Sequence, residues 1–201
     1  MSFQKIFYWA CAMSFLALAM GAFLKSEPSS PRNVGACKVV VADVGGNEVR
    51  PFGRTNAKAI VFVFVSSSCP IANRYAPEIQ RLQRAYKGVH FWLVHADPEE
   101  TSEEIAKNMR EYRYDCGVLR DPKHQIVSLA GARVTPEAAV FLPSGELVYR
   151  GRIDNRYENF GKARAEATRH DLQDAIEAVL KGKTPAVRET RAVGCYIPGI
   201  E

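Results

Sequence analysis

The chain has 201 residues, of which 47% are hydrophobic and 24% are charged, which indicates one globular domain with a sizeable core. The formal net charge of +5 is not accompanied by an aromatic-interleaved basic patch or by zinc-finger spacing, so we do not expect nucleic-acid binding. The sequence contains no C-x-x-C and no Cys/His cluster with structural zinc spacing, so no metal site is expected either.

The N-terminal segment is apolar. Lys5 precedes an uncharged stretch over residues 6–24, and a basic residue before such a run directs export. The stretch is also long enough to span a bilayer, so residues 1–24 are either a signal peptide or an uncleaved membrane anchor. Three small residues offer cleavage points: Ala17, Ala19 and Ala22. We expect the rest of the chain to be periplasmic or otherwise extracytoplasmic, soluble after cleavage or tethered to the inner membrane, with 25–36 as a polar linker.

The first part of the folded region alternates strands and helices. Residues 37–52 are predicted to form two short strands around a Gly45-Gly46-Asn47 turn. The segment "AIVFVFV", residues 59–65, is apolar at every position, which is typical of a strand buried on both faces. Residues 70–88 carry apolar side chains at helical spacing and end at a glycine.

The middle part repeats this alternation. A strand is predicted over 89–97 and a helix over 98–113, which begins with acidic and ends with basic residues, as the helix dipole favours. A short strand over 116–121 and a short helix over 124–132 follow.

The last part begins with two strands over 137–153, which are predicted to join at Pro143-Ser144-Gly145. A helix is predicted over 163–182, and the tail 183–201 is expected along the surface. Strands that alternate with helices and end in an antiparallel pair predict an α/β sandwich with a mixed central sheet flanked by helices.

Cys69 lies where the buried strand ends and the next helix begins. Open α/β sheets bind ligands at the carboxyl ends of their strands, and a helix N-terminus stabilises an anion such as a thiolate. Pro70 is tolerated in a first helical turn, and the three residues Ser66–Ser68 offer hydroxyl donors. We favour a reactive thiol over the alternative of a buried structural cysteine.

These residues resemble the active site of the thioredoxin-like superfamily. Cys69 matches the first cysteine of its C-x-x-C motif, and Pro77, eight residues on, matches its kinking proline. Thr135-Pro136 is similar to the family's cis-proline segment, and "VADVGGNEVRPF" resembles the N-terminal hairpin of the redoxin branch, which includes peroxiredoxins and alkyl hydroperoxide reductases. The resemblance covers 37–182. It implies a thioredoxin-like fold and a cis peptide that docks an extended partner chain or shapes the pocket beside the sulfur.

The chain departs from these families at informative positions. Ala72 replaces the second cysteine of C-x-x-C, so exchange within one motif is impossible. The peroxiredoxin motif is incomplete, because Phe62 stands where its proline should be, although Ser66 can substitute for its threonine. Copper-delivery proteins of the cytochrome oxidase assembly type use this fold with a C-x-x-x-C motif and a histidine. His95 is predicted near the thiol, but Asn73 stands where the second cysteine of that motif would be. The arginine that holds the thiolate in peroxiredoxins has three candidates: Arg74, Arg133 and Arg150.

A single nucleophilic thiol needs a second thiol for turnover, because attack leaves a sulfenic acid or a mixed disulfide. We prefer Cys195, which lies beside Gly194 in a mobile-looking tail that can fold back over the active site. The alternatives are a structural disulfide of Cys195 with Cys37 or Cys116, or a free thiol, and the pairing of four exported cysteines is not determined by sequence.

The sequence therefore predicts an exported, redoxin-type thiol oxidoreductase without a cofactor. Its nucleophile is Cys69, its substrate is a hydroperoxide or a disulfide-bearing protein, and its reductant is a thiol. Residues 6–24 would provide a membrane tether if they are retained. The alternative is a non-catalytic thioredoxin-like module that docks a partner or delivers a metal.

Overall fold

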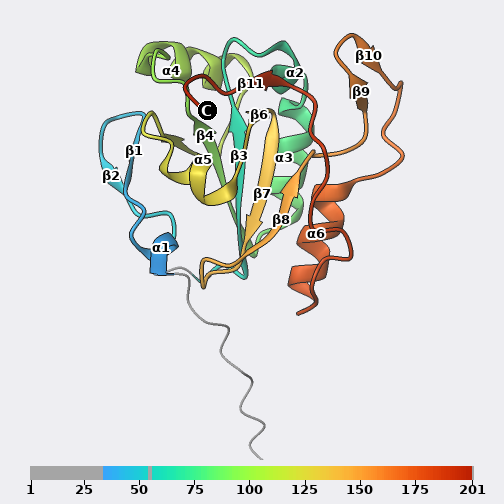
Figure 1. The fold of residues 1–201 in the computed structure, drawn as a ribbon. Coiled ribbons are helices and arrows are strands. Elements are labelled where there is room, and N and C mark those ends of the chain that lie inside the picture. Colours follow the sequence, from blue (N-terminus) through green and yellow to red (C-terminus); the bar gives the residue numbers. More distant parts are fainter. Residues whose placement is uncertain (1–33, 54–55, 201) are drawn as a thin grey trace, which may run out of the picture.

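The computed structural model describes residues 34–53 and 56–200, which form a mixed α/β sandwich around a seven-stranded sheet (Figure 1). The strand order is β2-β1-β5-β4-β3-β7-β8. The predicted signal peptide or anchor and residues 25–33 of the predicted linker lie outside the described residues, whereas residues 34–36, also predicted as linker, belong to helix α1 (Val34–Cys37). Within the described part of the chain, no helix is both long and apolar enough to cross a membrane.

The centre of the sheet is β3 (Ala59–Val65), and all seven of its residues are buried. It runs parallel to β4 (Val89–His95), which runs parallel to β5 (Gly117–Arg120). On its other side β3 pairs antiparallel with β7 (Glu137–Phe141), which pairs with β8 (Leu147–Gly151). Because β3 has neighbours on both sides and helices on both faces, its unbroken apolar sequence is confirmed as that of a fully buried strand.

The outer strands are short. At one edge, β1 (Val41–Asp43) pairs antiparallel with β5 and with β2 (Glu48–Val49). Outside the main sheet lie two small antiparallel ribbons. One joins β9 (Tyr157–Asn159) to β10 (Lys162–Ala163), and the other joins β6 (Val134–Thr135) to β11 (Cys195–Tyr196) of the tail.

Helices cover both faces of the sheet and enclose two apolar cores. The larger core includes residues of the following helices: α2 (Pro70–Arg74), α3 (Ala76–Ala85), α4 (Ser102–Glu111) and α6 (Asp171–Leu180). The second core includes residues of α1 (Val34–Cys37) and α5 (Gln125–Ala130). Ile197 of the tail belongs to the second core and is 4% exposed, so the tail packs against the domain.

Several helix predictions need correction. The helix expected over 70–88 is interrupted at Tyr75, because Pro77 has no N–H to donate to the carbonyl of Asn73. The helix expected over 98–113 begins only at Ser102, where the Thr101 side chain and Glu104 form a capping box.

Two further predictions differ at the ends of the domain. The helix expected over 163–182 begins at Asp171, because Asn155 Oδ1 accepts the backbone N–H groups of Thr168 and Arg169 and holds that segment as a loop. Cys37, expected to begin a strand, instead ends helix α1.

Candidate active site

Cys69 is the N-cap residue of α2, directly beyond β3. Its Sγ accepts the backbone N–H of Ala72 at 3.4 Å, which satisfies one of the free donors of the first helical turn. As a thiol it donates to the carbonyl oxygen of Thr135 at 3.0 Å. The residue is 1% exposed, so the sulfur is fully enclosed by protein.

The segment opposite Cys69 contains the predicted cis peptide. The Thr135-Pro136 bond is cis, as the sequence predicts, and both residues are buried. Thr135 ends β6, and its carbonyl oxygen faces the Cys69 sulfur. The thiol and the cis-proline segment, 66 residues apart in the chain, therefore meet at the end of the sheet.

The tail brings a second thiol to this place. In the ribbon of β6 and β11, Cys195 lies opposite Thr135 and Tyr196 lies opposite Val134. The Cys195 thiol is a neighbour of the Cys69 sulfur, and each group affects the ionisation of the other. Figure 1 shows β11 beside β6 above the upper end of β3. All four residues singled out from the sequence, Cys69, Thr135, Pro136 and Cys195, thus lie together.

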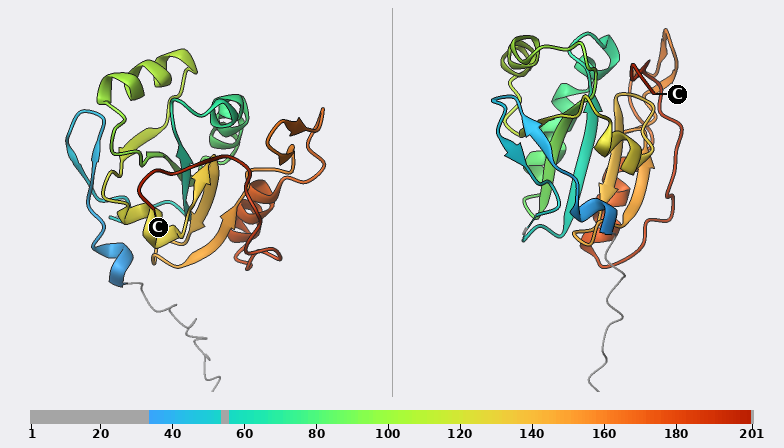
Figure 2. Two further views of the ribbon diagram at one scale, coloured as in Figure 1. Left: turned by 45° about the horizontal axis from the view of Figure 1, so that its top comes forward. Right: turned by 60° about the vertical axis from the view of Figure 1, so that its left-hand side comes forward.

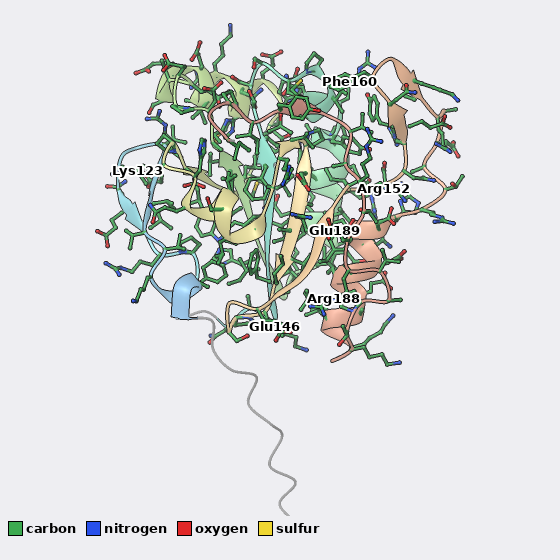
Figure 3. The ribbon with its side chains drawn as sticks, viewed as in Figure 1. Lys123, Glu146, Arg152, Phe160, Arg188 and Glu189 are labelled. Atoms are coloured by element: carbon green, nitrogen blue, oxygen red, sulfur yellow. The ribbon has the colours of Figure 1, made fainter. Side chains whose placement is uncertain are left out.

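Backbone pairing holds the tail on the N-terminal side of Cys195. The N–H of Arg150 in β8 donates to Arg188 O at 2.9 Å, and the N–H of Thr190 donates to Arg150 O at 3.0 Å. The Arg150 side chain also pairs with Glu189, and Thr190 Oγ1 lies 2.7 Å from Tyr149 Oη. Figure 2 shows the tail running beside β8 and ending near α5, and Figure 3 places Glu189 over β8.

The tail is also held next to Cys195 and beyond it. A Cβ on Gly194 would lie 2.0 Å from Thr135 O, so only glycine lets the tail approach the cis-proline strand this closely. The N–H of Ile197 donates to Arg133 O at 3.0 Å. The tail does fold back over the thiol, as proposed from the sequence, but it is fastened on both sides of Cys195 rather than free.

The pKa values of Cys69 and Cys195 are shifted in opposite directions. Burial opposes ionisation of Cys69, but the Ala72 N–H, the Cys195 thiol and the Thr135 hydroxyl favour the thiolate and together lower the pKa of Cys69 below its ordinary value. Burial and the neighbouring Cys69 sulfur raise the pKa of Cys195 to about 11. Cys69 is therefore the thiol that ionises first, and Cys195 is the one that keeps its proton.

A buried polar network supports the loop before Cys69. Glu100, 6% exposed, accepts the Ser67 N–H at 2.7 Å and lies 2.8 Å from His95 Nδ1. Asn73 Nδ2 donates to Ser67 O at 2.9 Å, and Asn108 Nδ2 donates to Asn73 Oδ1 at 3.0 Å. Burial opposes ionisation of Glu100, but hydrogen bonds from His95 and Ser67 lower its pKa.

Sequence reasoning missed Glu100 and Asn108. It anticipated His95 near the thiol, but the partner of this imidazole is Glu100.

The remaining cysteine and arginine candidates lie elsewhere. Cys116 is 8% exposed, and burial raises its pKa to about 12, which fits a structural role. Arg74 Nη1 lies 3.5 Å from Tyr157 Oη, and Arg150 binds Gly131 O and Glu189. In the described part of the chain no arginine is among the hydrogen-bond partners of the Cys69 sulfur. The side chain of Cys37 lies outside the description.

Comparisons with known proteins agree with this fold. The sequence profile of the AhpC/TSA family matches residues 36–150. No curated protein matches the chain. A hypothetical protein from Sinorhizobium meliloti 1021 is similar in structure, with 28% identity, coverage of 79% of this chain and 89% of that one, and a TM-score of 0.64.

Two further solved structures are similar. An uncharacterised conserved protein from Geobacillus kaustophilus has 26% identity, coverage of 80% and 89%, and a TM-score of 0.67. A secreted disulfide oxidoreductase from Mycobacterium tuberculosis has 14% identity, coverage of 73% and 97%, and a TM-score of 0.50, which supports the shared fold alone.

Proposed function

Because this chain belongs to the AhpC/TSA family of thioredoxin-like redoxins, we propose that it is a thiol-dependent oxidoreductase whose redox pair is Cys69 and Cys195. One observation carries the proposal. Cys195 lies on a strand paired with the cis-proline segment, opposite Thr135, whose carbonyl oxygen accepts a hydrogen bond from the Cys69 thiol. Two neighbouring thiols, of which one ionises first, suit thiol–disulfide exchange.

The reaction has two exchange steps. The Cys69 thiolate attacks one sulfur of a substrate disulfide, which forms a mixed disulfide and releases one substrate thiolate. Cys195 then loses its proton and attacks the Cys69 sulfur, which releases the second substrate thiolate and leaves a Cys69–Cys195 disulfide. The substrate gains two electrons, and a thiol reductant must return them to the protein.

A disulfide suits this site better than a hydroperoxide. The peroxidase motif is incomplete at Phe62, and in the described part of the chain no arginine hydrogen-bonds to the Cys69 sulfur. Because Cys69 is 1% exposed, the substrate reaches it when β11 separates from β6, and this ribbon has only two residue pairs. The apolar stretch over 6–24 supports export to an oxidising compartment, where disulfides persist.

Oxidation of the reduced full-length chain tests the proposal. After addition of a small disulfide, peptide mapping by mass spectrometry should find a Cys69–Cys195 bond in the wild type and in Cys116→Ser. In Cys195→Ser the small molecule should remain attached to Cys69. Unreactive thiols in all three proteins would contradict the enzyme and favour a non-catalytic module. Faster oxidation by a hydroperoxide than by any disulfide would change the substrate class.

A further inference from the structure

A polar pocket lies next to the redox pair, on the side of the β9–β10 ribbon. Its volume is about 510 Å³, within the range of small-molecule sites. Its lining comes from the start of the ribbon, from the loop that precedes α6, and from the tail. Four arginines line it: Arg152, Arg164, Arg169 and Arg191. Figure 3 shows Arg152 below the β9–β10 ribbon, near the beginning of α6.

A buried asparagine holds the loop that lines one side of this pocket. Asn155 is 9% exposed, and its Oδ1 accepts the N–H groups of Thr168 and Arg169 at 2.8 and 2.9 Å. Its Nδ2 donates to Thr168 Oγ1 at 2.8 Å, and its backbone oxygen accepts Arg164 Nη1 at 3.3 Å. This one side chain therefore fixes the loop that carries two of the four arginines.

The charges in the pocket are only partly compensated. Arg152 binds both carboxylate oxygens of Asp171, at 2.7 and 3.2 Å, and Arg164 pairs with Glu158 at 2.7 Å. Arg169 and Arg191 are exposed and have no ion-pair partner among residues 34–53 and 56–200. Two guanidinium groups thus remain free for an anion, and a guanidinium binds a carboxylate through two parallel hydrogen bonds.

Two residues of the pocket lining connect it to the segments that carry the cysteines. Val193 lines it and lies two residues before Cys195, about 7 Å along an extended chain. Tyr157, also in the lining, packs on Tyr75, the residue that follows α2, with ring centroids 5.7 Å apart. An anion bound by Arg169 and Arg191 would therefore lie near the chain segments that carry the redox pair.

We propose that this pocket binds the carboxylates of a low-molecular-weight thiol and so presents that thiol as the electron donor to the Cys69–Cys195 disulfide. The inference rests on the proposed function. Cys195 is partly exposed whereas Cys69 is buried, so the incoming thiolate attacks the Cys195 sulfur. The disulfide breaks, Cys69 leaves as a thiolate, and a mixed disulfide forms on Cys195. A second thiolate attacks the sulfur of the bound donor, which forms the donor's own disulfide and releases Cys195, which takes up a proton.

The first experiment measures reduction of the oxidised full-length chain by glutathione, which carries carboxylates, and by neutral 2-mercaptoethanol. Arg169→Gln/Arg191→Gln should slow the reaction with glutathione by about tenfold and change that with 2-mercaptoethanol by less than about twofold. Lys87→Gln/Lys107→Gln removes the same charge from exposed positions elsewhere and should leave both rates within about twofold. Equal slowing with both thiols, or in both double variants, overturns the proposal.

The second experiment measures binding without redox chemistry. In the Cys69→Ser/Cys195→Ser chain, titration calorimetry with S-methylglutathione should detect binding that is lost with Arg169→Gln/Arg191→Gln and kept with Lys87→Gln/Lys107→Gln. Binding that is absent, or unaffected by the arginine substitutions, overturns the proposal. If no Cys69–Cys195 disulfide forms in the wild type, the redox pair itself is contradicted. If the disulfide forms but glutathione reduces it equally in both double variants, only the pocket is contradicted.

Discussion

Cys69 and Cys116 are both buried, with exposures of 1% and 8%. The pKa values of their thiols are nevertheless shifted in opposite directions from that of an ordinary cysteine. Polar partners lower the pKa of Cys69 in spite of its burial. Burial without comparable partners raises the pKa of Cys116 to about 12. The comparison shows that the end of the sheet at which a thiol lies matters more than how deeply it is buried.

The two positions differ because the parallel strands have different surroundings at their two ends. Cys69 follows the carboxyl end of β3, where the Ala72 N–H in the first turn of α2 donates to its sulfur. Cys116 precedes the amino end of β5, at the opposite end of the sheet, where the Asp115 carboxylate further opposes ionisation. Backbone donors are present at Cys116 too, but there burial outweighs them, whereas at Cys69 the donors outweigh burial.

The largest expected effect is on the rate of disulfide reduction, when Cys69 and Cys116 are each replaced by serine. Cys69→Ser should reduce the rate of disulfide reduction at least a thousandfold, because a hydroxyl is a far weaker nucleophile than a thiolate at neutral pH. Cys116→Ser should keep the wild-type rate, since this thiol touches neither substrate nor Cys195. Turnover of a chromogenic disulfide measures both variants. A comparable loss in Cys116→Ser would remove the distinction between the two thiols.

Displacement of the tail should weaken the Cys69 site without touching either sulfur. In Gly194→Ala the new methyl group would collide with Thr135 O, so β11 should detach. We expect the Cys69–Cys195 disulfide to form about tenfold more slowly, because the thiols are no longer held as neighbours, while a small alkylating reagent reaches Cys69 faster. Gly88→Ala is the control, since its nearest neighbour would lie at 3.9 Å. Unchanged rates in Gly194→Ala would mean that the tail does not need this close approach.

A pH titration compares the two thiols directly. Ultraviolet absorbance of the thiolates, compared between wild type, Cys69→Ser and Cys116→Ser, should show Cys69 ionising below and Cys116 above the ordinary thiol pKa of about 8.5. The lowered pKa of Cys69 contributes stability that is present above about pH 8.5 and is lost as the pH falls through the folded-state pKa. The raised pKa of Cys116 contributes stability that is present below about pH 8.5 and is lost toward pH 12. Coincident titrations would contradict the comparison.

The smallest expected effect concerns the Cys195 thiol as a donor to the Cys69 thiolate. Cys195→Ala removes this donor and should raise the pKa of Cys69, whereas Cys195→Ser retains an O–H donor and should keep it low. Neither variant can form the disulfide, so thiolate absorbance is the readout. If both variants titrate alike, the Cys195 thiol does not contribute to the acidity of Cys69.

Local patterns were enough for part of the site. The uninterrupted apolar strand, the thiol at its end and the proline one residue later place Cys69 at a helix N-terminus, because each feature depends on residues close in sequence. Thr135-Pro136 was recognised through its family resemblance. The same patterns misplaced the start of α6, because Asn155 holds the preceding loop through contacts that span 13 and 14 residues.

The amino-acid sequence by itself determined that this protein is an α/β redoxin with one thiol at a strand–helix boundary. It nominated Cys195 as the second thiol but left other pairings open. Only the tertiary structure decided that Cys195 lies opposite Thr135, 60 residues away in the chain, that Glu100 supports the loop before Cys69, and that four arginines share a pocket beside the redox pair. Periodicity reports which face of one element is buried, whereas contacts between distant segments follow from the packing of the whole chain.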